Sequence, residues 1–182
     1  MKLENGKIMP RFRKLELDPL NKKGEAVSLS DPGDLLEMLH ATLEKGALLR
    51  FRAKGFSMSP FIRDDDVVTV SPLRGSPCRV GDVVAFVSPY SQRLMLHRVV
   101  GRGVDSCLIR GDHAPASDGL IPNVNILGRV SKVERNGRDV LLGLGCERLV
   151  IACLVRMGLF SGFLLPIWRR IHPIAKKWCA SS

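Results

Sequence analysis

The sequence predicts a mainly β fold, a compact and partly closed antiparallel β-barrel or sandwich, with one amphipathic helix before it and one apolar helix after it. Short apolar runs follow one another between residues 47 and 137. Gly, Pro, Asn and Asp residues separate these runs, and many short strands with frequent turn residues are typical of a compact all-β domain. The patterns on either side of this region are helical instead.

The first helix is expected over residues 32–45. Asp31 supplies a side chain that suits a helix N-cap, and Pro32 suits the first helical position. Leu35, Leu36, Leu39 and Leu43 then follow at helical spacing, up to Gly46.

The central region is expected to contain six short strands, at 48–51, 67–70, 83–87, 94–100, 107–110 and 128–133. Asn136-Gly137 is a strong signal for a tight turn between strands. The short apolar run 140–144 follows this turn and predicts one more strand.

The second helix is expected within residues 149–168, which read LVIACLVRMGLFSGFLLPIW. This run is long enough to cross about 30 Å of hydrocarbon. Arg156 within it carries an insertion cost of roughly 2.5–3.5 kcal/mol at the centre of a bilayer. Three alternatives therefore stay open: a membrane span, an amphipathic helix on a membrane surface, and a helix packed on the β domain.

The chain has 182 residues and a formal net charge of +10. Three segments differ in net charge. Residues 1–46, a polar segment with its helix, have a net charge of zero. Residues 47–137, the β-rich domain, and residues 138–182, a basic and apolar tail, each have a net charge of +5. Aromatic residues make up only 5%, so stacking on single-stranded nucleic acid is disfavoured. Residues 1–31 contain no apolar run of the kind found in a secretory signal peptide or N-terminal membrane anchor.

The five cysteines do not form a CxxC pair and are odd in number, which argues against a zinc site or a disulfide framework. We expect free, buried thiols. No residue pattern indicates a metal ion or an organic cofactor.

Three segments carry candidate chemistry. The first, KGFSMSP, contains Ser57 in a turn where Gly55 permits unusual backbone angles and Pro60 stiffens the exit. The second, LMLHRVV, places His97 in an apolar strand, and a neutral imidazole is suited to deprotonating a serine hydroxyl. The third, RGDHAPASDG, contains Asp112 and Asp118, either of which is able to orient an imidazole.

Taken in order, these segments resemble the type I signal peptidase family. The matching frame runs from GFSMSP through VGDVVAF, HRVV and RGDHAPASDG to NILGRV. With His97 in the second segment, the sequence resembles the endoplasmic-reticulum and archaeal form of the family, which uses Ser and His. The common bacterial form has a lysine at this place. Lysine is absent between Lys54 and Lys132.

The resemblance implies that Ser57 is the nucleophile of a serine endopeptidase and that His97 is its general base. Asp118, with Asp112 as an alternative or supporting group, would hold the imidazole. Gly55, Ser57 and Met58 would form the substrate-binding and oxyanion region. The fold would be of the signal-peptidase or LexA-like type, and no cofactor is needed.

The expected partner is a leader or signal-type peptide of a protein substrate, with no specific nucleic acid. Membrane contact is expected through residues 149–168, on a side that the sequence leaves open, and the rest of the chain is expected to be cytoplasmic. The absence of an N-terminal apolar helix departs from the family and leaves the substrate open. Two alternatives remain: a LexA-like regulator that cleaves itself, and a basic, non-enzymatic module that binds membranes or nucleic acid.

Overall fold

The computed structural model describes residues 18–19, 41–43 and 45–159. The predicted mainly β fold is confirmed: one antiparallel sheet contains the strands in the spatial order β1-β2-β3-β8-β4-β5-β6-β7, and β9 pairs with β8 beside this path. The strands are β1 (Asp18–Pro19), β2 (Leu49–Arg52), β3 (Val67–Pro72), β4 (Val83–Val87), β5 (Leu94–Arg102), β6 (Ser106–Arg110), β7 (Ser117–Pro122), β8 (Ile126–Arg135) and β9 (Arg138–Asp139).

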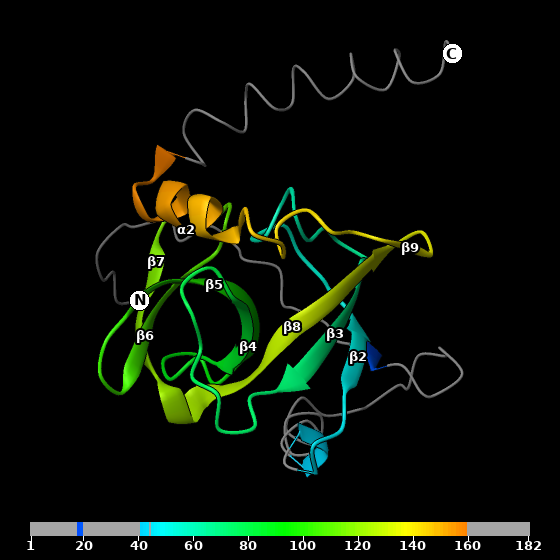
Figure 1. Cartoon of the computed structure of the whole chain (residues 1–182), viewed down its shortest axis with the longest axis horizontal. Helices are drawn as coiled ribbons and strands as arrows, with labels where there is room; N and C mark the ends of the chain where they lie inside the picture. The colour runs from blue at the N-terminus through cyan, green and yellow to red at the C-terminus, as the bar shows by residue number, and fades with distance from the viewer. Residues whose placement is uncertain (1–17, 20–40, 44, 160–182) are drawn as a thin grey trace, which may run out of the picture.

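The predicted closure into a barrel is wrong, because the sheet stays open between its outer strands β1 and β7. The ten-residue β8 lies in the middle and pairs with β3 on one side and β4 on the other (Figure 1). Register shifts interrupt the β3–β8, β4–β8, β5–β6 and β6–β7 pairings. Such bulges bend and twist strands, so the sheet curves without its outer strands meeting.

The predicted turn at Asn136-Gly137 is confirmed. Both residues have positive φ, 51° and 74°, and Arg135 pairs with Arg138 across the turn. These angles suit a type I′ hairpin turn, in which both central residues have positive φ. The strand expected at 140–144 is wrong, because β9 ends at Asp139 and a turn follows.

The described part of the apolar tail forms α2 (Arg148–Arg156), which packs against β5. Its inward residues Ile151, Ala152 and Val155 share a buried cluster with Phe61 and Val100. The helix ends before Gly158, whose φ of 74° is typical of a C-terminal cap. Residues 160–168 of the expected helix lie outside the described residues.

The first helix is described only at residues 41–43, which are helical, and the rest of its expected range lies outside the described residues. Among the described helices, none combines the length and the apolar character needed to cross a bilayer.

Two buried clusters fill the sheet region. One surrounds Phe51, Met58, Val68 and Val133, and the other surrounds Phe86, Val99, Ile109 and Ile121. β4 is buried along its whole length, and β5 is buried at seven of its nine positions. His97 therefore lies on a strand that is largely buried and pairs with a neighbour on each side.

Candidate active site

Ser57, His97 and Asp118 lie in one hydrogen-bonded chain. Nε2 of His97 is 2.9 Å from Oγ of Ser57, and Nδ1 of His97 is 2.7 Å from Oδ2 of Asp118. In the neutral imidazole, Nδ1–H donates to the carboxylate and Nε2 accepts the serine hydroxyl. This is the connectivity of a nucleophile, a general base and an orienting acid.

The three side chains come from separate elements. Ser57 lies in the turn that follows β2, His97 on β5 and Asp118 on β7. β6 separates β5 from β7 in the sheet, and a register shift between Ile109 and Arg110 interrupts the β6–β7 pairing near Asp118. The sheet therefore brings together residues that are 40 and 21 positions apart in the chain.

The imidazole of His97 is held in a largely dry environment. Its side chain is 4% exposed, while that of Asp118 is 18% exposed. The aromatic ring of Phe86 lies beside it, with the ring centroids 6.0 Å apart. Within such a site, hydrogen bonds are electrostatically stronger than in water.

The loop that follows β6 fits closely around the serine and the histidine. The backbone N–H of His113 donates to the carbonyl oxygen of Ser57 at 2.8 Å. A Cβ atom built on Gly111 would lie 2.8 Å from that carbonyl oxygen and 2.9 Å from Nε2 of His97. Only glycine fits at this position without displacing one of the two groups. No local pattern in the sequence indicates Gly111 as a site residue.

Two backbone amides at the nucleophile are available for an oxyanion. Among the described residues, the N–H groups of Ser57 and Met58 donate to no backbone or side-chain acceptor. Gly55 has φ of 104°, and its N–H donates to Oδ1 of Asp64 at 2.7 Å. The amide of Gly55 is therefore already engaged, and Gly55 contributes the bend of the turn.

Met58 plays a narrower part than the sequence suggested. Its side chain is only 4% exposed and belongs to the hydrophobic core. The side chain therefore belongs to the core, which leaves the backbone N–H as the part of Met58 able to donate to an oxyanion.

Asp112 does not hydrogen-bond to His97. Its two carboxylate oxygens accept from Nε and Nη2 of Arg98, each at 2.7 Å, and both side chains are fully buried. Burial raises the pKa of Asp112, and the Arg98 guanidinium opposes this shift. Asp112 is thus a supporting residue, and Asp118 is the carboxylate on the imidazole.

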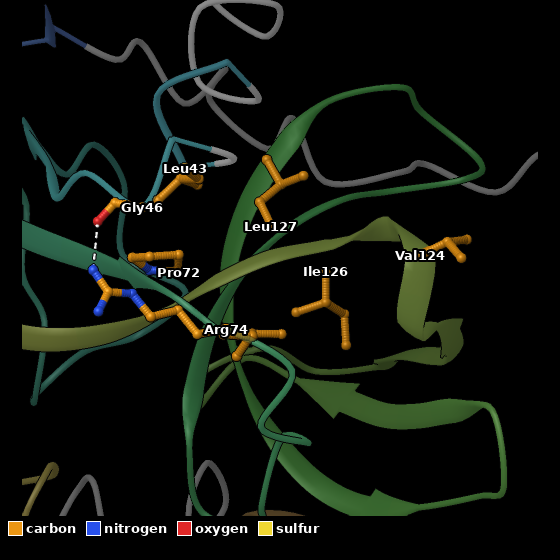
Figure 2. Close-up of a pocket in the computed structure, with 8 residues that line it drawn as sticks. Leu43, Gly46, Pro72, Arg74, Val124, Ile126 and Leu127 are labelled. Atoms are coloured by element: carbon orange, nitrogen blue, oxygen red, sulfur yellow. Dashed lines mark hydrogen bonds between the residues drawn. The ribbon is translucent and has the colours of Figure 1, made fainter.

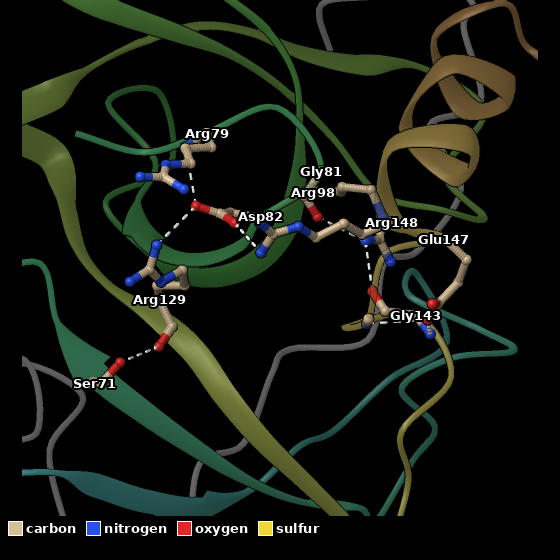
Figure 3. A network of polar contacts seen from close by, with 10 residues as sticks. Ser71, Arg79, Gly81, Asp82, Arg98, Arg129, Gly143, Glu147 and Arg148 are labelled. Carbon is tan, nitrogen blue, oxygen red and sulfur yellow. Dashed lines mark hydrogen bonds and ion pairs between the residues drawn. The ribbon is translucent and has the colours of Figure 1, made fainter. Parts of the chain in front are cut away.

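The sequence did not indicate the importance of Arg98. Nη1 of Arg98 donates to the carbonyl oxygens of Gly81 and Gly143, each at 2.8 Å (Figure 3). Its guanidinium also lies over the ring of Phe61. One signal in the sequence points to its role: Arg98 follows His97 within an apolar strand pattern, and a buried arginine there needs an acidic partner such as Asp112.

Ion pairs engage several arginines of the β-rich domain and the first residue of α2. Asp82 is contacted by Arg129 and Arg148, at 3.2 and 2.8 Å (Figure 3). Asp66 accepts two hydrogen bonds from Arg135, at 2.8 and 2.7 Å. These arginines therefore make structural contacts within the described part of the chain.

A pocket of about 500 Å³ is lined by residues other than the candidate catalytic ones. It is lined by Leu43, Gly46, Pro72, Leu73, Arg74, Val124, Ile126 and Leu127. Figure 2 shows Arg74 reaching across to the carbonyl oxygen of Gly46, at 3.0 Å. Ser57, His97 and Asp118 are not among its lining residues, so we do not assign the pocket to the catalytic site.

Comparisons with protein-family models, with curated proteins and with solved structures find no match to this chain. Among the described residues, no three His, Cys, Asp or Glu side chains gather in a way that would hold a metal ion. The candidate site is therefore defined by the turn that holds Ser57 and by His97 on β5 and Asp118 on β7.

Proposed function

We propose that the chain is a serine endopeptidase, similar to type I signal peptidases of the Ser–His form, that cleaves a leader or signal-type peptide. The chain of contacts from Ser57 through His97 to Asp118 carries this proposal. We also propose that the open, bulged sheet is a variant of the signal-peptidase and LexA-like fold, as the ordered motifs imply.

In the proposed mechanism, Oγ of Ser57 attacks the scissile carbonyl carbon while Nε2 of His97 takes the hydroxyl proton. Asp118 stabilises the imidazolium that forms. The amides of Ser57 and Met58 donate to the developing oxyanion, and preorganised donors of this kind contribute about 2.7–4 kcal/mol each in related chemistry.

The tetrahedral intermediate then collapses. The C–N bond breaks, His97 returns the proton to the leaving amine, and an acyl ester remains on Ser57. A water molecule, deprotonated by His97, attacks this ester, and the second collapse releases the carboxylic acid and restores the serine hydroxyl. No cofactor is needed for either half of the reaction.

The test uses the full chain and a synthetic leader peptide with an apolar run and small residues at the cleavage site. Ser57→Ala and His97→Ala should each abolish the products seen by mass spectrometry. Ser59→Ala is the matched control, because Ser59 lies in the same turn without joining the hydrogen-bonded chain, and it should retain cleavage. Cleavage of equal rate in Ser57→Ala would overturn the assignment.

The same samples test the LexA-like alternative. Intact mass over time shows whether the chain cuts itself, and self-cleavage that is lost in Ser57→Ala without peptide cleavage would favour that alternative. LexA-like proteins pair serine with lysine, whereas here Lys54 contacts Asp65 and His97 contacts Ser57.

A further inference from the structure

Tyr90, the only tyrosine of the chain, reaches the strand that carries the orienting carboxylate. It is 80% exposed and lies in the hairpin loop that joins β4 to β5. A Cβ atom built on Gly119 would lie 4.0 Å from the hydroxyl oxygen of Tyr90 and, its chain neighbours aside, near no other atom of the described residues. Because Gly119 directly follows Asp118 on β7, the phenol lies next to the end of the hydrogen-bonded chain that starts at Ser57.

The hairpin loop holds the backbone of Tyr90 in a defined conformation. The N–H of Ser88 donates to the carbonyl oxygen of Arg93 at 2.9 Å, and the N–H of Gln92 donates to the carbonyl oxygen of Ser88 at 2.8 Å. The side chain of Gln92 donates to the carbonyl oxygen of Pro89 at 3.2 Å. A tyrosine side chain has only two χ angles, so its ring loses little entropy when it contacts a ligand. The loop therefore presents an aromatic ring that is largely preorganised for binding.

β7 leaves space beside Asp118. Ser117 and Gly119 pair with consecutive residues of β6, so Asp118 between them is the extra residue of a β-bulge, a feature that re-aims side chains near active sites. Gly119 has a φ of 84° and carries no side chain to fill the space toward Tyr90. β7 is also the last strand in the sheet order, so none of the other described strands covers its outer edge. The surface between Tyr90 and Gly119 is therefore open to a ligand.

The proposed reaction determines which half of the substrate meets this surface. His97 returns the proton to the leaving amine, so the chain after the scissile bond lies on the side of His97. The imidazole contacts Ser57 at 2.9 Å through one nitrogen and Asp118 at 2.7 Å through the other, which places Asp118 beyond the imidazole as seen from the serine. An extended peptide advances about 3.3 Å per residue. The second residue after the scissile bond is then the one that reaches Gly119 and Tyr90.

We propose that Tyr90 forms a binding site for the second residue after the scissile bond and selects a bulky apolar side chain there, such as leucine or phenylalanine. This inference rests on the proposed peptidase function and extends it to the sequence that follows the cut. The exposed ring offers apolar surface to such a side chain. The carboxylate of Asp118 disfavours an acidic side chain at this place, and the exposed Arg93 of the same hairpin disfavours a basic one.

The first test compares leader peptides that differ only at the second residue after the cut, with leucine, serine or lysine there. In the parent, kcat/KM should be about tenfold higher for the leucine peptide than for the serine peptide, since apolar contacts discriminate by about 10–200-fold. Tyr90→Ala should abolish this preference, chiefly by raising KM for the leucine peptide, and should leave the serine peptide unchanged. Tyr90→Phe should keep the preference, because the ring provides the contact. The matched control is Val104→Ala, which changes another highly exposed side chain, in the β5–β6 turn, and should behave as the parent does.

The second test measures binding without cleavage. Because Tyr90 is the only tyrosine, fluorotyrosine incorporated into the full chain gives a single fluorine resonance that reports on this residue. In the Ser57→Ala variant, which should bind peptide without cutting it, saturation with the leucine peptide should shift this resonance more than saturation with the serine peptide does.

Equal kcat/KM for the leucine and serine peptides would overturn the inference, as would a leucine preference that survives in Tyr90→Ala. A lysine peptide that is cleaved faster than the leucine peptide, or a fluorine resonance that stays in place in the saturated complex, would overturn it as well. These outcomes leave the peptidase function intact. Failure of the parent to cleave any of the three peptides would instead overturn the proposed function and this inference with it.

Discussion

Arg98, the residue after His97 on β5, forms a fully buried bidentate ion pair with Asp112, with both contacts at 2.7 Å. The pair joins β5 to the loop that contacts Ser57, because Asp112 lies between Gly111 and His113. Through Gly143, Arg98 also joins the segment that leads into α2. Hydrogen bonds of Arg98 therefore join β5 to the segment that leads into α2.

Removing the arginine should destabilise the fold strongly. Arg98→Met leaves Asp112 as a buried charge without its partner, and we expect a loss of about 3–5 kcal/mol in the free energy of unfolding, measured by urea denaturation. Arg102→Met changes an exposed arginine at the end of the same strand and should cost far less. Arg98→Met/Asp112→Leu should recover part of the loss, since no unpaired charge remains. Equal losses in Arg98→Met and Arg102→Met would contradict this role.

Adding one methyl group at Gly111 should impair catalysis more than folding. The new Cβ of Gly111→Ala would meet Nε2 of His97 and the Ser57 carbonyl, so we expect about a 10²-fold fall in kcat for the leader peptide. Gly137→Ala is the control: it strains a turn whose φ is 74° and costs about 1–2 kcal/mol of stability, but it should keep kcat. A Gly111→Ala enzyme with unchanged kcat would show that the contact is not tight in solution.

Replacing the orienting carboxylate should slow the reaction and leave the fold in place. Asp118→Asn removes the charge that stabilises the imidazolium and favours the wrong tautomer, so we expect kcat to fall by about 10²–10⁴-fold. Asp112→Asn, in contrast, should lower stability first, because Asp112 pairs with Arg98. The exposed residue Asp105 provides the control substitution Asp105→Asn. Unchanged kcat in Asp118→Asn would exclude it from the site.

The cysteines should divide into two classes of reactivity. Cys78 and Cys107 are buried, whereas Cys146 and Cys153 are exposed, so the expectation of uniformly buried thiols is wrong for the latter two; Cys179 lies outside the described residues. Burial raises the pKa of Cys78 to about 11 and raises that of Cys107 as well. Since the thiolate is the reactive form, iodoacetamide should modify Cys146 and Cys153 first, as peptide mapping would show. Early modification of Cys78 would contradict this.

Glu147 should make stability depend on pH. Hydrogen bonds from its own backbone amide and from Gly143 hold the pKa of Glu147 below its ordinary value. The stability that the ionised form contributes is present above the ordinary value, about 4.3, and is lost as the pH falls through the lower, folded value. Glu147→Gln should therefore be less stable than the parent at neutral pH, and the two unfolding free energies should converge at low pH. Parallel curves across that range would contradict this role for Glu147.

Much of the fold was predictable because strand patterns are local. The apolar run at 83–87 coincides with β4, and the Asn136-Gly137 signal coincides with a type I′ turn. β7 was missed, because its SDGLIP sequence contains one buried residue and lacks the alternation of a half-buried strand. The strand expected at 140–144 was wrong, because this segment forms a turn in which the side chains of Leu141 and Leu142 are exposed.

In the candidate site, too, the residue types were predictable from local sequence and the distances between them were not. Ser57, His97 and Asp118 were singled out by their order and surroundings in the chain. Their distances depend on β6 lying between β5 and β7, which no local pattern indicates. The same holds for Gly111, whose role appears only because the Ser57 turn packs against it.

The sequence by itself determined the class of fold, the turn chemistry and the residue types able to form a serine–histidine site, because these depend on neighbours within a few positions. The tertiary structure decided which aspartate meets His97, because Asp112 lies in the loop after β6 and Asp118 lies on β7, and their spacing in the chain does not show which carboxylate reaches the imidazole. It also decided that Arg98 takes the other aspartate, because a buried guanidinium needs a buried carboxylate. Finally, it decided which side of α2 is buried, since Ile151, Ala152 and Val155 pack with Phe61 and Val100.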